Sequence, residues 1–177
     1  MSTGMASAIV VILAAVLAAC SSPAPIQTAK QVDLERFMGD WYVIANIPTW
    51  LERDAHNAVE SYRLAEDGSV ATTFSFRQGG FEGELNRYHP TGYVLDRETN
   101  AVWGMQFIWP VQADYRILFV DESYSQTVIG RNARDYVWLM ARTPDLPDPD
   151  YQRFLTLIAR EGYDVSKVRK VPQRWNR

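Results

Sequence analysis

Apolar and polar residues alternate along short segments through most of the chain after residue 40. In residues 70–77, the apolar side chains of Val70, Phe74 and Phe76 recur at even spacing, which places them on one face of a strand. Asp67-Gly68, just before this segment, is a strong signal for a hairpin turn. The same pattern predicts eight strands, over residues 41–47, 59–64, 70–77, 85–95, 101–109, 115–120, 125–130 and 136–142.

These strands follow one another at regular spacing, and short polar turns join most of them, as in an antiparallel meander. The free edges of such a sheet need protection, and closure into an up-and-down barrel removes them. Pro90 and Gly92 interrupt the segment 85–95, which indicates an edge or a bend there.

The period of the pattern changes after residue 147. Apolar residues then recur at the spacing of one helix face, at Tyr151, Phe154, Leu155, Ile158 and Ala159. Asp-Pro-Asp at 148–150 predicts a helix start with an acidic cap, and Gly162 predicts the helix end. We expect this helix against the outside of the barrel and residues 165–171 as a last strand. The predicted fold class is all-β with one C-terminal helix, an eight-stranded antiparallel up-and-down β-barrel.

The N-terminal region has a different composition. Residues 8–19 form an apolar run with the length of a signal-peptide core, too short to span a bilayer comfortably. The run ends in Leu-Ala-Ala-Cys at residues 17–20, which resembles the lipobox of bacterial lipoproteins, and Cys20 is the only cysteine. We therefore expect a signal peptide over 1–19, a lipidated Cys20 with a tether over 20–32, and a barrel domain over 33–177.

Acyl chains on Cys20 would hold the protein at a membrane, since one chain binds only marginally and several bind stably. Ser21 resembles the residue found in lipoproteins that move on to the outer membrane. The expected location is thus the bacterial outer membrane, lipid-anchored, on its periplasmic face. The formal net charge of −3 gives no reason to expect a nucleic-acid partner. The 6 Trp, 9 Tyr and 7 Phe suit either a packed β core or an aromatic-lined cavity.

Three motifs in order resemble those of the lipocalins, and most of all the bacterial lipoprotein lipocalins. Gly39-Asp40-Trp41-Tyr42 matches the first motif, Asp114-Tyr115 the second and Arg142 the third, although Ala113 stands where Thr often precedes the Asp. Gly39, Trp41, Asp114, Tyr115 and Arg142 are therefore interpreted as structural residues. Trp41 and Arg142 lie on the first and eighth strands, which are neighbours in a closed barrel, so we expect the guanidinium to stack on the indole.

A barrel of this size holds one small ligand in its lumen. If Trp41 points inward, alternation places Val43 and Ala45 on the same side, and Glu60 would be a polar anchor near the opening. For each candidate, ordinary core packing is the alternative. The lumen candidates are Val43, Ala45, Glu60, Tyr62, Phe74, Phe76, Tyr115, Ile117, Trp138 and Met140.

No pattern in the sequence supports catalysis. His56 and His89 are the only histidines, and neither has a partner at metal-ligand spacing, so no metal and no cofactor is expected. Asp145, Asp148 and Asp150 are explained by helix capping.

The resemblance implies a carrier, not an enzyme, that binds a fatty acid or lysophospholipid for lipid storage, transport or envelope maintenance. A barrel plugged by its own aromatics that acts through surface contacts is the second interpretation, and a lipocalin enzyme on a lipophilic substrate is the third. Trp50 and Leu51, in the loop 48–56, either cover the lumen, which we favour, or touch a membrane. A homodimer is left open.

Overall fold

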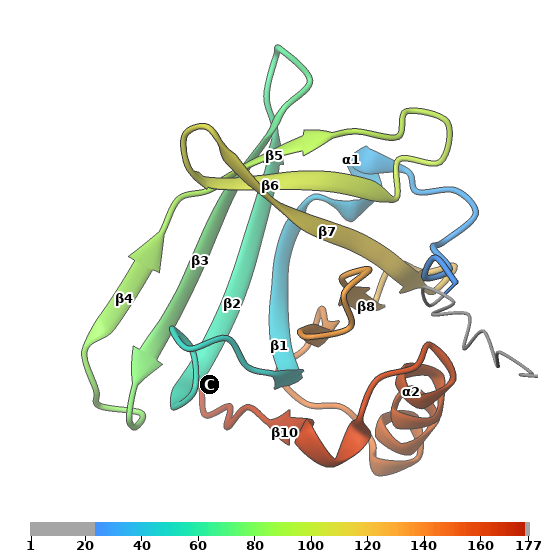
Figure 1. Cartoon of the computed structure of the whole chain (residues 1–177). Coiled ribbons are helices and arrows are strands. Elements are labelled where there is room, and N and C mark those ends of the chain that lie inside the picture. The colour runs from blue at the N-terminus through green and yellow to red at the C-terminus, as the bar shows by residue number, and fades with distance from the viewer. Residues whose placement is uncertain (1–23, 176–177) are drawn as a thin grey trace, which may run out of the picture.

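The computed structural model describes residues 24–175, which form one sheet of ten strands with two α-helices (Figure 1). The elements are α1 (Leu34–Phe37), β1 (Gly39–Ile47), β2 (Ala55–Leu64), β3 (Val70–Gln78), β4 (Leu85–Tyr88), β5 (Thr91–Val94), β6 (Val102–Ile108), β7 (Val111–Val120), β8 (Gln126–Gly130), β9 (Val137–Ala141), α2 (Asp148–Arg160), the 3₁₀ turn η1 (Val165–Lys167) and β10 (Arg169–Lys170). The predicted signal peptide over residues 1–19 and the predicted lipidation site Cys20 lie outside the described residues.

The sheet closes on itself. Neighbouring strands pair antiparallel in chain order, and β1 pairs with both β2 and β9, with Tyr42 opposite Ala141. β4 and β5 both pair with β3, so they are two halves of one barrel strand bent at His89 and Pro90. The predicted eight-stranded antiparallel barrel, with one helix near the C-terminus, is confirmed, as is the bend in the segment 85–95.

The two ends of the barrel differ. We call the end that carries α1 and the turns at 65–69, 95–101 and 121–125 the closed end. We call the end that carries the loops 48–54, 79–84, 109–110 and 131–136 the open end.

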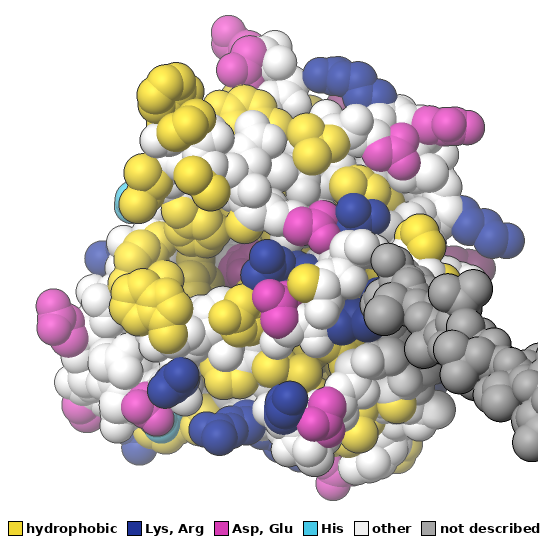
Figure 2. All heavy atoms as spheres, in the orientation of Figure 1, with side chains coloured by type: hydrophobic (Ala, Val, Ile, Leu, Met, Phe, Trp, Pro, Cys, Tyr) yellow, Lys and Arg dark blue, Asp and Glu magenta, His cyan; other side chains and the backbone are white. Residues whose placement is uncertain are grey.

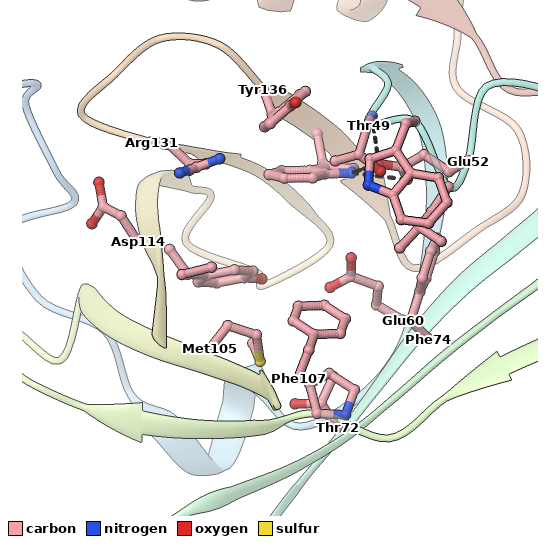
Figure 3. Close-up of a pocket in the computed structure, with 16 residues that line it drawn as sticks. Thr49, Glu52, Glu60, Thr72, Phe74, Met105, Phe107, Asp114, Arg131 and Tyr136 are labelled. Atoms are coloured by element: carbon pink, nitrogen blue, oxygen red, sulfur yellow. Dashed lines mark hydrogen bonds between the residues drawn. The ribbon is translucent and has the colours of Figure 1, made fainter. Parts of the chain in front are cut away.

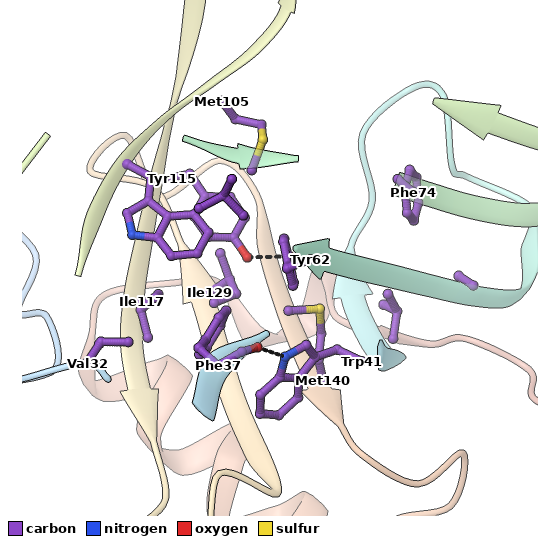
Figure 4. Close-up of a cluster of buried hydrophobic side chains, with 14 of the residues drawn as sticks. Val32, Phe37, Trp41, Tyr62, Phe74, Met105, Tyr115, Ile117, Ile129 and Met140 are labelled. Carbon is purple, nitrogen blue, oxygen red and sulfur yellow. Dashed lines mark hydrogen bonds between the residues drawn. The ribbon is translucent and has the colours of Figure 1, made fainter. Parts of the chain in front are cut away.

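Two groups of buried side chains lie on the two faces of the sheet. The interior cluster is centred on Phe37, Trp41, Tyr62, Trp103 and Tyr115 inside the barrel (Figure 4). The outer cluster lies between the barrel wall and α2, whose Tyr151, Phe154 and Ile158 are buried there. The predicted position of the helix is therefore confirmed.

A bulge in β1 explains one error of face assignment. The pairing of β1 with β9 shifts register between Val43 and Ala45, so alternation breaks at this point. Val43 belongs to the interior cluster, whereas Ala45 belongs to the outer cluster. The expectation that Ala45 faces the lumen is wrong, because the bulge turns the rest of the strand over.

The ends of α2 match the prediction in part. Gly162 follows the helix with a φ of +89°, which suits glycine, and the helix ends at Arg160 as expected. The start differs, because Pro147 is the N-cap and makes no side-chain hydrogen bond there. Asp148 is instead the first helical residue, and its carboxylate accepts a hydrogen bond from Lys170 Nζ at 3.2 Å.

Both segments that flank the barrel pack against it. Ile26 and Val32 are buried, and Val32 N donates to Thr99 O, so the packed domain begins before residue 33. At the other terminus, the predicted strand over 165–171 is reduced to η1 and the two residues of β10, which pair with β1. Within residues 24–175, no helix is long and apolar enough to cross a membrane.

Candidate functional site

A cavity of about 210 Å³ occupies the barrel at its open end (Figure 3). Its wall comes from the β1–β2 loop, from β2, β3, β6, β7 and β9, from Pro90 between β4 and β5, and from the β8–β9 loop. The residues that line it are Thr49, Trp50, Leu51, Glu52, Glu60, Thr72, Phe74, Pro90, Met105, Phe107, Ala113, Asp114, Tyr115, Arg131, Tyr136 and Trp138. The wall is thus mainly apolar and aromatic, with a few polar groups, as is usual for small-molecule sites.

The predicted lumen residues divide between the cavity and the packed interior. Glu60, Phe74, Tyr115 and Trp138 line the cavity. Five other predicted lumen residues do not line the cavity. They belong to the interior cluster that fills the barrel: Val43, Tyr62, Phe76, Ile117 and Met140. Side chains therefore fill part of the barrel interior, and the cavity occupies another part.

The floor of the cavity carries a chain of three polar groups. Tyr62 Oη donates to a carboxylate oxygen of Glu60 and lies 2.6 Å from Tyr115 Oη. Because the Tyr62 proton is used by Glu60, Tyr115 is the donor to Tyr62. Alternation placed Glu60 and Tyr62 on one face, and the fold brings Tyr115 to them from the other side of the barrel.

A second buried carboxylate, Glu52, was not predicted. It lies in the β1–β2 loop and is 3% exposed, with hydrogen bonds from Trp138 Nε1 at 3.1 and 3.2 Å and from Thr49 N at 3.0 Å (Figure 3). Its neighbours Leu51 and Arg53 form no periodic pattern with it, so the sequence contains no signal that the loop folds inward.

Both carboxylates have a raised affinity for protons. Burial raises the pKa of Glu60 to about 7, and the charge of Glu52 adds to the rise, while the hydrogen bond from Tyr62 opposes it. Burial also raises the pKa of Glu52. Glu60 therefore exists in both protonation states near neutral pH, so this part of the cavity carries less negative charge than two ordinary carboxylates.

The cationic group of the cavity is Arg131, which was not among the predicted lumen residues. Arg131 Nη1 pairs with Asp135 Oδ2 at 3.1 Å, and the guanidinium lies 5.3 Å from the centre of the Tyr136 ring. Its Nε is buried and has no hydrogen-bond partner among residues 24–175. Arg131 therefore has one buried donor that no described residue satisfies.

Residues of the three sequence motifs hold parts of the barrel together, and Asp114 and Tyr115 of the second motif also line the cavity. Arg142 lies over Trp41, with 3.8 Å from its guanidinium carbon to the ring centre, so the predicted stacking is confirmed. Trp41 Nε1 donates to Phe37 O at 2.8 Å. Asp114 Oδ2 accepts a hydrogen bond from Asn132 N at 2.7 Å, which fixes the β8–β9 loop at the open end.

The two histidines lie apart, with His56 against Phe81 and His89 near Thr73 Oγ1. In the part of the chain that the structure describes, no group of three or more His, Cys, Asp or Glu side chains is placed to hold a metal ion.

A closed eight-stranded barrel with an apolar cavity at one end defines a class of proteins that bind small hydrophobic ligands. Comparison with known proteins identifies the family. The profile of the lipocalin-like domain matches residues 32–173. The chain therefore belongs to the lipocalin family.

Individual relatives agree with this assignment. The chain is 30% identical to the outer membrane lipoprotein Blc of Escherichia coli K12, over 88% of this chain and 89% of the relative. It is 29% identical to temperature-induced lipocalin-1 of Arabidopsis thaliana, over 84% and 83%. Among solved structures, insecticyanin from the tobacco hornworm Manduca sexta superposes with a TM-score of 0.67 at 14% identity, over 85% of each chain.

Proposed function

We propose that this lipocalin is a membrane-anchored protein that binds a fatty acid or lysophospholipid in the open half of its barrel, for lipid storage, transport or envelope maintenance. The observation that carries the proposal is the apolar cavity at the open end of an otherwise packed barrel. Each methylene group that leaves water for such a cavity contributes about 0.8 kcal/mol. A single acyl chain suits a narrow cavity because it buries much apolar surface for its width.

The arrangement of polar groups supports one orientation of the ligand. Glu52 and Glu60 lie in the cavity wall and disfavour an anionic group beside them. Arg131 lines the cavity from the β8–β9 loop and is the cationic side chain among the lining residues. The acyl chain therefore enters first, and the carboxylate or phosphate stays at the open end near Arg131.

The proposed location is the bacterial outer membrane, on its periplasmic face, through acyl chains on Cys20. Support comes from the lipobox-like sequence before Cys20 and from the similarity to a protein named as an outer membrane lipoprotein. The test is Cys20→Ser in the full chain, with the mass and the membrane fraction as readouts. Recovery of the variant and the wild type in the same fraction, with no acyl mass on either, would refute the anchor.

The packed half of the barrel supports a second candidate function. Because the interior cluster fills part of the barrel, the cavity of about 210 Å³ lies below the roughly 300–1,000 Å³ of common ligand pockets. In this alternative, the barrel is a scaffold, and its exposed surface acts on the envelope.

The decisive experiment compares two neighbouring threonines of β3. Thr72 lines the cavity, whereas Thr73 lies on the opposite face of the same strand. Residues 24–175 contain every barrel strand and both buried clusters, so a protein of residues 24–177 contains the complete folding unit. Native mass spectrometry with palmitate or a lysophospholipid should show a one-to-one adduct for the wild type and for Thr73→Trp.

Thr72→Trp should lose that adduct, because the indole occupies the space of the acyl chain. A cooperative thermal transition in each variant verifies the fold. Absence of any adduct from the wild type, or equal adducts from the two variants, would favour the scaffold alternative.

A further inference from the structure

The open end of the barrel carries the most exposed apolar side chains of the described chain. Ile108 is 76% exposed and Trp109 is 82% exposed in the hairpin between β6 and β7, and Trp50 is 74% exposed in the β1–β2 loop. We call residues 107–111 the hairpin tip. Its other apolar members, Phe107 and Val111, are also exposed. Hydrophobic side chains gather around the hollow of the cavity on this face (Figure 2).

The composition of the hairpin tip differs from that of other turns in the barrel. Residues 105–113 contain no charged side chain, and neither do residues 49–51. The turns at 65–69 and 121–125, by contrast, carry Asp and Glu residues. An uncharged loop with exposed Trp, Ile and Val costs free energy in water unless something covers it.

The path of the N-terminal segment brings the expected anchor to the same end of the barrel, at the β8–β9 loop. Ala24 O accepts a hydrogen bond from Arg134 Nη2 at 2.8 Å, and Ile26 N donates to Asn132 Oδ1 at 3.0 Å. Both partners belong to the β8–β9 loop at the open end, and Arg131 of this loop lines the cavity. Cys20 precedes Ala24 by four residues, which span at most about 14 Å when extended.

We propose that the open end docks on a lipid bilayer, with the hairpin tip and Trp50 inserted at the boundary between headgroups and acyl chains. Tryptophan is enriched at this depth of the membrane because its ring is apolar and its N–H is polar. The short connection to Cys20 keeps the open end within reach of the bilayer, and in this respect the inference rests on the proposed function. An acyl ligand then passes between bilayer and cavity without crossing water.

The occupant is a bilayer for two reasons. The hairpin tip and Trp50 belong to different loops that both border the cavity, so a protein bound across them would close the cavity to its ligand. Insertion of these loops also removes no charged side chain of the tip from water. Insertion of the hairpin tip and Trp50 therefore buries apolar surface without moving a charged side chain of residues 105–113 or 49–51 out of water.

The test uses residues 24–177, without leader or Cys20, and vesicles of phosphatidylcholine with brominated acyl chains, which quench tryptophan at their own depth. The wild type should float with the vesicles and show quenched fluorescence. Ile108→Ser with Trp109→Ser should lower the partition coefficient roughly tenfold or more, because most of the inserted apolar surface is lost. The matched control is Leu95→Ser, which removes an exposed apolar side chain at the closed end and should stay within about twofold of the wild type.

Native mass spectrometry of the same variants with palmitate separates docking from ligand binding. If the Ile108→Ser, Trp109→Ser protein binds palmitate but no longer binds the vesicles, the result supports membrane binding through the open end. If the wild type does not bind vesicles, or if the double variant and Leu95→Ser lower the partition coefficient equally, the proposed membrane binding is wrong. Either result leaves the cavity proposal intact. A wild-type dimer in sedimentation that the double variant converts to a monomer, without vesicle binding, would assign the surface to a second copy and also overturn the dock.

Discussion

The closed and open ends of the barrel use similar residue types for opposite purposes. At the closed end, Trp41 is fully buried, and Arg142 stacks on it while donating hydrogen bonds to the main-chain carbonyls of Asp40 and Met38 at 2.8 and 2.7 Å. At the open end, Trp109 lies in solvent, and Arg131 retains a donor that no described residue uses.

The closed end therefore mainly stabilises the barrel, whereas the open end provides the space for a ligand. Side chains at the closed end satisfy one another, so their removal leaves cavities and unpaired polar groups. Side chains at the open end leave space and unpaired groups, which cost stability but give a ligand its place. Changes at the two ends should therefore have separable effects on unfolding and on binding.

The largest expected effect comes from Trp41→Ala. Loss of the buried indole should lower the free energy of unfolding by about 3–5 kcal/mol, because the interior cluster cannot collapse around the gap. The matched change at the open end, Trp50→Ala, should stay within about 0.5 kcal/mol. Urea unfolding followed by circular dichroism measures both, and equal losses would contradict the division of the barrel.

The next effect is a dependence of stability on pH. Glu60 has a folded pKa of about 7 against an ordinary value of 4.5, so the folded state holds the proton more tightly. The contribution of Glu60 to stability is therefore largest below pH 4.5 and is lost as pH rises through 7. Between about pH 5.5 and pH 8.5, this group should cost on the order of 2 kcal/mol.

Glu60→Gln should flatten this decline. Glu52, whose pKa is also raised by burial, contributes in the same direction and remains in the variant. Tyr62 and Tyr115 stay neutral in this range because burial raises the pKa of each further, and Asp114 and Arg131 are present in both proteins. Parallel pH profiles for wild type and variant, from urea midpoints, would show that Glu60 is not the titrating group.

A smaller effect is expected from Arg142→Lys. An ammonium group cannot stack flat on Trp41 and donate to several carbonyls together, so the free energy of unfolding should fall by about 1–2 kcal/mol. Arg131→Lys, at the open end, should change it by less than about 0.5 kcal/mol. If Arg131→Lys lowers the free energy of unfolding more than Arg142→Lys does, the open end and not the closed end would be the more stabilising of the two.

The smallest effect is expected from Gly39→Ala. Gly39 has a φ of +93°, and an added Cβ would lie 3.2 Å from Arg142 Nη1. The positive φ and the contact with Arg142 together should cost about 1 kcal/mol, measured as a lower melting temperature, and more than the positive φ alone costs at Gly68. Gly68→Ala is the control, because its φ is +80° but no atom lies within 4 Å of the added Cβ. An equal cost in both would mean that backbone strain, and not contact with Arg142, determines the effect.

The fold was predictable because its signals are local. Alternation and turn residues such as Asp67-Gly68 locate most strands, and the apolar face of 151–158 locates α2. Ala45 was misplaced because a bulge depends on the partner strand and leaves no mark in its own segment. The exposure of the hairpin tip was not predicted, because the apolar residues up to 109 were assigned to the end of the strand over 101–109.

The candidate site was predictable only where it lies on strands. Glu60, Phe74, Tyr115 and Trp138 follow the alternation, and they line the cavity. Glu52 and Arg131 lie in loops, where no period fixes the direction of a side chain. How far the lumen is filled depends on the packing of side chains from several strands, which no single segment encodes.

The most direct test of the division between the two ends is a crystal structure of residues 24–177 with a bound lysophospholipid. Our account predicts electron density for the acyl chain between Phe74, Tyr115 and Trp138, with the phosphate near Arg131 and with Trp41 and Arg142 unmoved. Density for the chain among the residues of the closed end, with Trp41 displaced, would contradict the account.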